Sequence, residues 1–548
     1  MKKHFVDPNL NSARYAEPEE LKEDYTYVSY AEPDPSRPNA VAGLTIEVDC
    51  NEAGEVKGAV LDGSDTNTIL VSATGSGKTR WVISSYILSV ICALQSFIVH
   101  DPKGEIYLFF KSLLEKFHYR IRVLNLREPR TGDRLNPLQE AARLWKMDEK
   151  GRAMDIVYAR AITLYSPLED KNDKFWTLSA INLFKCYFAI AATIYPAEHV
   201  SFATIYKIHV EGLRKVGATT AMNIYLEAHR KEQFYDWGIP AVGAPNDTRT
   251  SIYSVFTNGL VPVMMNEDVA DMTTSSTFDA DELVEDDTPT AVFIITRDES
   301  PATYSSIVST YVDMIYTKLI DLAQTKYSNA LSRTVHFVLE EFGNIAKLEN
   351  INDMMSAARS RNIRMLICVQ SLCQLYLTYT KELAHVLIGN SQNLVFMSST
   401  DMELVKMISD RCGTYIDPYT NEKSPLLSPD RLTHLDKKKG EVLMLLGRHY
   451  PYITSLPDLS MYKMISPIDK AEFPERERVE VKEGVFTKIT ADILAEKTKE
   501  ACKAAEKTNS KDQEKKDSPK TISRAEMLSM PSDLKTSLDN IISERSSS

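Results

Sequence analysis

Residues 72–79 read Ser-Ala-Thr-Gly-Ser-Gly-Lys-Thr, and they lie between the apolar residues 69–71 and the helix-like segment 80–83. A strand, a glycine-rich loop and a helix in this order are the context of a phosphate-binding P-loop. Gly75 and Gly77 let the backbone turn so that successive N–H groups point at phosphate oxygens. The dipole of the following helix favours the same negative charge. The stretch therefore predicts a nucleotide site rather than a glycine-rich turn without a ligand.

The positions of this loop have expected roles. Lys78 is expected to contact the β- and γ-phosphates, and the Thr79 hydroxyl to ligate Mg²⁺. Ser72 stands where the pattern has its first glycine, and a small residue need not block the turn. The predicted ligands are ATP and Mg²⁺. The residues expected to surround the nucleotide are Ser72, Ala73, Thr74, Gly75, Ser76, Gly77, Lys78 and Thr79.

A second apolar run, residues 335–339, ends in two carboxylates, Glu340 and Glu341. A strand that ends in this way is the Walker B arrangement, in which the first carboxylate holds the Mg²⁺ shell and the second polarises the attacking water. We therefore predict that Glu340 belongs to the metal site and that Glu341 is the general base. Glu340 replaces the usual Asp and is one methylene longer, so we expect it to bind Mg²⁺ through water in a shifted position.

Two further segments fit an ATP-driven motor. Gln370 ends the next apolar run, where a sensor of the γ-phosphate is expected, although a polar strand terminus is the alternative. Arg359 and Arg361 precede that run. An arginine donated to the γ-phosphate of a neighbouring subunit accelerates hydrolysis by orders of magnitude. Either arginine fits this catalytic role in a ring, and a solvated basic turn is the competing interpretation.

The composition indicates a folded protein of two to four domains, since the chain has 548 residues of which 43% are hydrophobic. Its seven cysteines show no zinc-type spacing, which indicates reduced thiols. The net charge of −12 argues against a surface coated with nucleic acid but not against a basic channel. Arginines between residues 120 and 134 supply local positive charge, and a solvated face explains them equally well.

Short apolar runs separated by helical stretches predict a buried parallel sheet with helices on both faces, which is an α/β fold. The runs that follow the P-loop are residues 96–100, 121–124, 291–295, 335–339, 365–369, 393–397 and 441–446. Between these runs, helical periodicity dominates residues 139–285, which predicts an inserted all-α domain. Ligands bind beyond the carboxyl ends of the strands in such sheets, where Asp101, Glu340 and Gln370 are expected.

The expected domain boundaries follow from these changes in pattern. Residues 41–66 predict a β-hairpin before the P-loop strand, and residues 524–544 a last amphipathic helix. The chain after residue 491 is charged and reads as a solvated helix or a linker. The predicted units are an irregular acidic arm (1–40), the nucleotide-binding domain in two parts (41–138 and 286–470), the inserted all-α domain (139–285) and a charged, partly disordered tail (471–548).

Several motifs resemble those of one family, the TraG/TraD-like coupling-protein ATPases of type IV secretion and conjugation. Asp101-Pro-Lys-Gly-Glu-Ile-Tyr107 resembles the family's DPKGELY, and Leu339-Glu-Glu-Phe-Gly-Asn344 its LDEFGN. Residues 359–361 and 370–375 are similar to its RSR and QSLSQL. The remaining matches, which extend the resemblance from about residue 66 to 455 in the family's order, are Leu124-Asn-Leu126, Leu135-Asn-Pro-Leu138, Phe175-Trp176 and residues 390–413.

This resemblance implies a RecA-like P-loop domain with an inserted all-α domain, assembled as a homo-hexameric ring. Members of the family recruit relaxase–DNA complexes or protein effectors to a type IV secretion channel. The chain is therefore expected to hydrolyse ATP and to move single-stranded DNA, with its relaxase attached, toward the channel components. The alternatives are a double-stranded DNA translocase of the FtsK/HerA type and a receptor that binds ATP only to assemble and hands its cargo onward.

No segment of the sequence reads as a membrane span. Polar residues interrupt the apolar stretch 81–100, the stretch 181–195 is short and contains Lys185, and residues 1–7 lack the apolar core of a signal peptide. The family's usual N-terminal pair of membrane helices has no counterpart here. The chain is therefore expected to be cytoplasmic, and to be recruited to the cytoplasmic face of the membrane by an anchoring partner protein.

Overall fold

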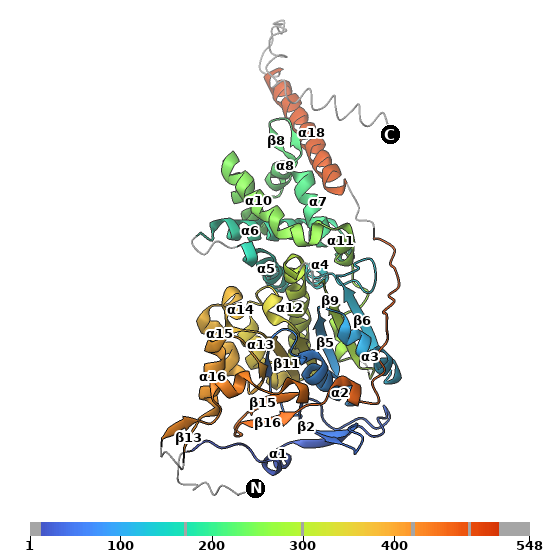
Figure 1. Ribbon diagram of the computed structural model, residues 1–548. Helices are drawn as coiled ribbons and strands as arrows, with labels where there is room; N and C mark the ends of the chain where they lie inside the picture. Colours follow the sequence, from blue (N-terminus) through green and yellow to red (C-terminus); the bar gives the residue numbers. More distant parts are fainter. Residues whose placement is uncertain are drawn as a thin grey trace. The chain divides into compact units, whose positions relative to one another are not determined.

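The computed structural model describes residues 12–168, 173–285, 287–297, 301–417, 422–479 and 484–513, without the side chains of 301–303 and 501–513. The amphipathic helix expected at 524–544 lies outside this range. The chain forms two compact units (Figure 1). The sheet unit contains residues up to 135 together with 276–477, and the helical unit contains residues 136–275 together with those from 478 onward.

The sheet unit is built on a nine-stranded sheet with the order β16-β15-β12-β4-β11-β10-β5-β9-β6. All the apolar runs expected to be strands are strands of this sheet. The nine strands of the sheet are β4 (Thr68–Ser72), β5 (Ser96–Asp101), β6 (Arg120–Asn125), β9 (Thr290–Ile295), β10 (Val335–Leu339), β11 (Ile363–Val369), β12 (Asn393–Ser398), β15 (Glu441–Leu446) and β16 (Tyr452–Ser455).

Seven of these strands are parallel, and the expectation of a parallel strand at 441–446 is wrong. Every neighbouring pair from β12 to β6 is parallel, whereas β15 pairs antiparallel with β12 and with β16. The register joins Phe396 near the end of β12 to Leu443 near the start of β15. The chain therefore enters β15 from the edge at which β12 ends, and an antiparallel pair needs no crossover to the other edge.

Helices cover both faces of the sheet, which explains why its central strands are buried at nearly every position and are mostly apolar. On one face, Phe97 and Val99 pack in a core that includes residues of α2 (Ser84–Cys92) and α3 (Glu105–Lys116). On the other face, the ring of Phe337 contacts that of Tyr316 in α12 (Pro301–Thr325) at a centroid distance of 6.1 Å. Figure 1 shows these layers.

The N-terminal region contains a small antiparallel sheet of order β1-β3-β2. The hairpin expected at 41–66 is confirmed as β2 (Leu44–Cys50) and β3 (Val56–Asp62). The irregular arm expected over 1–40 is wrong for part of its length, because it contains α1 (Pro18–Asp24) and β1 (Thr26–Ser29). Pro18 starts the helix with a capping box, and Leu21 and Val28 are only 1% and 4% exposed. These buried side chains order the segment despite its acidic, proline-bearing sequence.

The helical unit consists of helices and one pair of two-residue strands, β7 (Lys215–Val216) and β8 (Thr219–Thr220). Asp148, at φ 64°, separates its first two helices. The helices are α4 (Gln139–Lys146), α5 (Lys150–Tyr165), α6 (Phe175–Ile194), α7 (Phe202–Gly212), α8 (Ala221–Ala228), α9 (Gln233–Val242), α10 (Asn246–Met264), α11 (Glu267–Met272) and α18 (Val485–Gln513).

The last helix corrects the boundaries expected for the charged tail. Residues 471–477 belong to the sheet unit, and α18 packs on α7 and α8 of the helical unit. Phe486 is fully buried beside Tyr225, with ring centroids 5.1 Å apart. The Glu211 carboxylate accepts hydrogen bonds of 2.9 Å from the N–H groups of Gly484 and Thr487. The first turn of α18 is apolar, but the charged sequence after residue 491 led us to expect a solvated tail.

Within the described part of the chain, one helix, α6, is long and apolar enough to cross a membrane by length and composition. It extends over 20 residues, further than the stretch 181–195 suggested, and 67% of its most apolar window is buried inside the protein. Burial of this kind is also found in the core helices of soluble domains.

Candidate active site

The predicted site residues, apart from Arg359 and Arg361, come together at one edge of the sheet. Since β4, β10 and β11 are parallel neighbours, the residues that follow them lie side by side at their carboxyl ends. We call this the carboxyl edge, and the opposite edge, where the same strands begin, the amino edge. The P-loop follows β4, Glu340 and Glu341 follow β10, and Gln370 follows β11.

The P-loop has the backbone that its glycines predict. Gly75 and Gly77 have φ of 73° and 93°, a region that strains other residues. A Cβ on Gly77 would lie 3.2 Å from the Trp81 ring, so a larger residue there would require that ring to shift. The hydroxyls of Ser72 and Ser76 are hydrogen-bonded to each other. Serine in place of the first glycine is therefore accommodated within the loop.

The P-loop and the segment that follows β10 meet at Glu340. The Thr79 hydroxyl donates a hydrogen bond of 2.6 Å to Glu340 Oε1, and Lys78 Nζ lies 3.3 Å from the same oxygen. Lys78 Nζ is also 3.7 Å from Glu341 Oε1. The Thr79 and Glu340 oxygens suit a hard cation such as Mg²⁺, which binds one or two carboxylates together with substrate phosphates. Mg²⁺ bound in this way needs no larger set of protein ligands. The described residues contain no group of three or more His, Cys, Asp or Glu that could hold a metal ion.

Burial and charge act against each other in this cluster. Burial lowers the pKa of Lys78, but the Glu340 and Glu341 carboxylates outweigh it, and the net pKa is raised. Burial raises the pKa of Glu340, whose side chain is 6% exposed, while Lys78 and the Thr79 hydroxyl offset part of the increase. Lys78 is therefore a cation at neutral pH, and it neutralises charge on two adjacent carboxylates.

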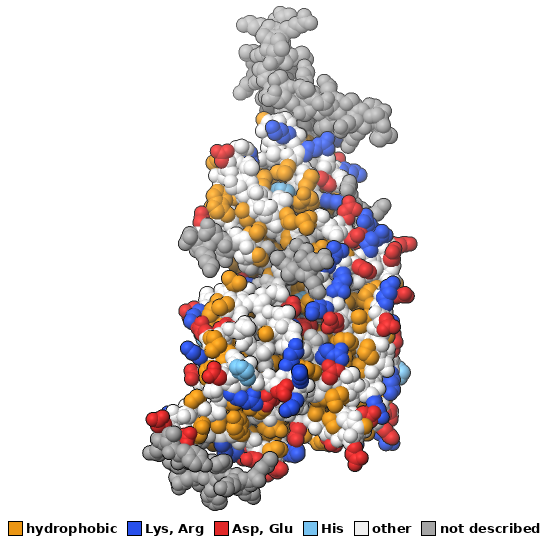
Figure 2. All heavy atoms as spheres, in the orientation of Figure 1, with side chains coloured by type: hydrophobic (Ala, Val, Ile, Leu, Met, Phe, Trp, Pro, Cys, Tyr) orange, Lys and Arg blue, Asp and Glu red, His pale blue; other side chains and the backbone are white. Residues whose placement is uncertain are grey.

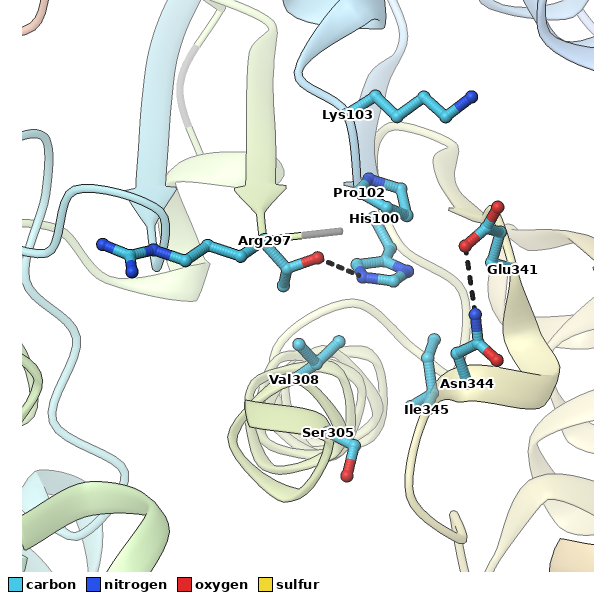
Figure 3. A pocket seen from close by; sticks show the side chains of 10 residues that line it. His100, Pro102, Lys103, Arg297, Ser305, Val308, Glu341, Asn344 and Ile345 are labelled. Atoms are coloured by element: carbon cyan, nitrogen blue, oxygen red, sulfur yellow. Dashed lines mark hydrogen bonds between the residues drawn. The ribbon is translucent and has the colours of Figure 1, made fainter. Parts of the chain in front are cut away.

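Glu341 has an unusual backbone and a fixed side chain. Its φ and ψ of 54° and 45° are left-handed, which is uncommon for a residue other than glycine. Asn344 Nδ2 donates a hydrogen bond of 3.0 Å to Glu341 Oε2. Figure 3 shows this pair beside a cavity of about 240 Å³. The other lining residues are His100, Pro102, Lys103, Thr296, Arg297, Ser305, Val308 and Ile345.

Gln370 lies against the P-loop, as expected for a residue near the phosphates. The Thr74 hydroxyl donates a hydrogen bond of 3.0 Å to Gln370 Oε1. Ser399, which follows β12, donates from its hydroxyl to the Gln370 carbonyl at 3.3 Å. The side chain of Gln370 is therefore held by the P-loop, while its backbone carbonyl is bound from the end of the neighbouring strand β12.

Arg359 and Arg361 are not brought to the P-loop of their own chain. They form a single turn before β11, at the amino edge. Arg359 Nε donates to the Asp65 carbonyl at 3.1 Å, and its Nη2 lies 3.4 Å from the Asp65 carboxylate. Arg361 Nη1 donates to the Asn329 carbonyl at 3.0 Å. The whole of β11 separates both arginines from Gln370.

Asp101 has a structural place in the sheet unit. Its side chain is fully buried, and Oδ2 accepts the N–H of Tyr107 at 3.0 Å, in the first turn of α3. Burial raises the pKa of Asp101 to about 7. Gly104, at φ 70°, provides the turn into that helix. These contacts account for Asp101-Pro-Lys-Gly-Glu105 as a strand-to-helix connection at the carboxyl edge.

The arginines between 120 and 134 are engaged within the protein. Arg122 donates to both oxygens of Glu282, at 2.9 and 3.0 Å. Arg127 donates to the carbonyls of Pro102 and Thr296 at 2.9 and 3.2 Å. These two arginines therefore belong neither to a free basic surface nor to a solvated face.

Four contacts of the site were not predicted from the sequence. Lys437 Nζ donates a hydrogen bond of 2.6 Å to the Gly75 carbonyl. His100 Nδ1 donates to the Glu340 carbonyl at 2.7 Å, and Gln374 Nε2 donates to Asn344 Oδ1 at 2.9 Å. The fourth is the ion pair of Arg80 with Asp458, at 2.6 Å. A run of three lysines reads as a solvated turn, so only the fold reveals that Lys437 reaches the P-loop.

A P-loop strand, a Walker B strand and an all-helical unit on a mainly parallel sheet define a P-loop NTPase with a helical domain. Residues 31–451 match the family model described as type IV secretory system conjugative DNA transfer. The match covers most of the chain, and the chain belongs to this family of coupling proteins. The family resemblance and the fold class expected from the motifs are thus confirmed.

Solved structures of the bacterial conjugative coupling protein TrwB share this fold. The unbound TrwBdeltaN70 structure has a TM-score of 0.57 at 15% identity, covering 87% of this chain and 95% of that one. TrwB with the ATP analogue ADPNP has a TM-score of 0.60 at 14% identity over 87% and 96%. TrwB with ADP and Mg²⁺ has 0.58 at 15% over 86% and 96%. No curated protein sequence gives a significant match.

Proposed function

We propose that this protein is an ATP-hydrolysing coupling protein that delivers a relaxase–DNA or protein substrate to a type IV secretion channel. The observation that carries the proposal is the contact of Lys78 and Thr79 with Glu340, which joins P-loop and Walker B groups in a member of this family. The TrwB structures with ADPNP and with ADP and Mg²⁺ support ATP and Mg²⁺ as the ligands.

Each side chain has a role in this proposal. Lys78 moves from the carboxylates to the β- and γ-phosphates and neutralises their charge. Thr79 and Glu340 hold Mg²⁺, which when bound neutralises charge that develops on the phosphates. Glu341 accepts a proton from the attacking water through Oε1, the oxygen nearer Lys78. Gln370 is placed to sense the γ-phosphate through its contact with Thr74.

The position of Arg359 supports a ring. The residue lies at the amino edge, remote from its own P-loop, and its side chain is 41% exposed. A catalytic arginine at this position requires a second subunit whose P-loop it can reach. We therefore include a homo-hexamer in the proposal, with Arg359 as the candidate trans residue and Arg361 as the alternative.

The substrate side of the proposal assigns cargo selection to the helical unit and movement of single-stranded DNA to the ring. A purified chain should hydrolyse ATP faster with single-stranded than with duplex DNA of the same length. Greater stimulation by duplex DNA would favour the double-stranded translocase instead. A chain that binds ATP but shows no turnover with DNA or relaxase would be the non-hydrolysing receptor.

Three further experiments test other parts of the proposal. Glu341→Gln should retain ATP binding and lose hydrolysis, with Glu105→Gln as a matched control; normal turnover would remove Glu341 as the base. A pull-down of relaxase or effector should depend on the helical unit, which requires deletion of both 136–275 and the residues from 478 onward. Fractionation of cells with and without the other secretion components tests whether an anchoring partner recruits the protein from the cytoplasm to the membrane.

A further inference from the structure

Two glutamines in one short segment contact the two halves of the site. Gln370 accepts the hydrogen bond from Thr74 of the P-loop, at 3.0 Å. Gln374, in the first turn of α14 (Leu372–Thr378), instead donates to Asn344 in the turn after the Walker B strand. The segment between them therefore spans from the phosphate loop to the residue that holds Glu341.

The hydrogen bonds that lead from Gln374 through Asn344 to Glu341 are donated in one direction, and we call this chain of contacts the relay. Gln374 Nε2 donates to Asn344 Oδ1 at 2.9 Å, and Asn344 Nδ2 donates to Glu341 Oε2 at 3.0 Å. The Asn344 amide thus accepts on one side and donates on the other. This arrangement leaves Glu341 Oε1 directed toward Lys78, at 3.7 Å, and Figure 3 shows the pairing of Glu341 with Asn344.

The relay is held rigidly at its far end. The N–H of Gln374 donates to the Ser371 hydroxyl at 3.1 Å, which caps α14. The N–H of Leu372 donates to Asp401 Oδ2 at 2.9 Å. A Cβ on Gly343 would lie 2.3 Å from the Gln374 side chain, so the Walker B turn packs directly on this glutamine. The position of Gln374 is therefore fixed by neighbouring elements rather than by Asn344 alone.

We propose that Asn344 and Gln374 are positioning residues that orient the Glu341 carboxylate for proton abstraction, and this inference rests on the proposed role of Glu341. Glu341 has left-handed backbone angles, and a residue other than glycine keeps such a strained conformation only where neighbouring groups hold it. A carboxylate held through one oxygen presents the other in a defined direction, and orientation of a reacting group contributes strongly to rate. The inference explains why Asn344 and Gln374 occur in the two motifs, 339–344 and 370–375.

The amide polarity provides the decisive test. Asn344→Ala should lower kcat about 10–100-fold with the Kd for ATP changed less than about twofold, since a positioning residue acts on the chemical step. Gln374→Ala should lower kcat less. Gln374→Glu should be worse than Gln374→Ala, because a carboxylate there accepts from Asn344 Nδ2, turns the amide and sets Asn344 Oδ1 against Glu341. A merely structural role predicts that the isosteric Gln374→Glu is the milder change.

The controls are Asn350→Ala and Cys373→Ala, two exposed neighbours whose side chains serve neither contact. The double variant Asn344→Ala, Gln374→Ala should have the kcat of Asn344→Ala alone, because Gln374 acts through Asn344. Additive losses, an equal loss of ATP affinity, or a Gln374→Glu variant more active than Gln374→Ala would overturn the inference. If Glu341→Gln hydrolyses ATP normally, the proposed function fails instead, and the two failures are distinguishable.

Discussion

The amino and carboxyl edges of the sheet both bury polar groups, but they satisfy them differently. At the amino edge, Asp62 is 2% exposed and accepts hydrogen bonds from Ser64, Thr66 and Asn393. At the carboxyl edge, the Glu340 and Glu341 carboxylates adjoin each other and share one cation, Lys78. At the amino edge, neutral donors surround one carboxylate, whereas at the carboxyl edge two carboxylates lie close together.

The difference separates structural from functional polar groups. The Asp62 carboxylate needs no ligand, since both of its oxygens have protein donors. At the carboxyl edge, burial raises the pKa of Glu340 despite its lysine partner, so the carboxylates there are only partly stabilised by the protein. A bound cation and phosphate would complete that set. Changes to the Asp62 network should therefore act on stability, and changes to Lys78, Glu340 and Glu341 on nucleotide chemistry.

The largest expected effect is that of Lys78→Ala at the carboxyl edge. The phosphates lose their cation, so ATP binding and hydrolysis should both fall below detection. The melting temperature should stay close to that of the parent protein, because Glu340 can take up a proton once its partner is gone. Isothermal titration and an ATPase assay measure this. Lys111→Ala, a lysine paired only with Glu115 on α3, is the matched control and should change neither.

Arg359→Ala tests whether the amino edge is purely structural. In a ring, the variant should bind ATP normally but hydrolyse it at least about 10³-fold more slowly. Mixing it with Lys78→Ala subunits should restore part of the activity, since each variant supplies what the other lacks at a shared interface. Normal activity of Arg359→Ala with no change on mixing would move the role to Arg361 or remove it.

His336→Ala should affect the amino edge alone. His336 Nε2 donates to Gln95 Oε1 at 2.6 Å, so its Nδ1 accepts from the Tyr86 hydroxyl at 2.8 Å. Burial lowers the pKa of His336 to about 3, which keeps this fully buried ring neutral. Its removal should reduce the free energy of unfolding by about 2–4 kcal/mol, from lost hydrogen bonds and a cavity. Urea unfolding measures this, and an altered ATP affinity at 10 °C would contradict the separation of the two edges.

Lys437→Ala should have the smallest effect, at the carboxyl edge. Lys437 contacts the outside of the P-loop through the Gly75 carbonyl and is exposed. Its loss removes one charge-assisted hydrogen bond, worth about 1.5–3 kcal/mol when buried and less when exposed, so ATP affinity should fall only about threefold. Fluorescent-nucleotide titration detects this. The neighbouring Lys438→Ala should leave ATP affinity unchanged. An equal effect of both substitutions would mean that Lys437 acts only through its positive charge and not through its hydrogen bond.

The sequence predicted those parts of the site that lie in continuous segments. The P-loop and the two carboxylates are each contiguous, and parallel strands must end at one edge, so the meeting of Thr79 with Glu340 follows from the fold class. The contact of Lys437 with Gly75 joins residues 362 positions apart, and no local pattern encodes it. The pairing of Asn344 with Gln374 was equally hidden, although both residues stand in recognisable motifs.

The fold was predictable where periodicity decides the structure. Largely apolar runs such as β4 and β10 predict strands that are buried on both faces, and both strands are buried at every position. The direction of β15 was not predictable, because an apolar strand reads the same in parallel and antiparallel pairing. The helix at 485–513 was misplaced, since its anchoring side chain, Phe486, precedes a long charged sequence. Pairing partners, rather than strand and helix identity, were the missing information.

The burial of Phe486 against Tyr225 has a consequence for synthesis of the chain. The helices α4 to α11 emerge from the ribosome before residue 276, but α18 emerges only after the second part of the sheet unit. At about 5–20 residues per second, that delay is on the order of 10–40 s. During this interval the apolar surface of α8 that will receive Phe486 stays uncovered. Completion of the helical unit is therefore tied to synthesis of nearly the whole chain.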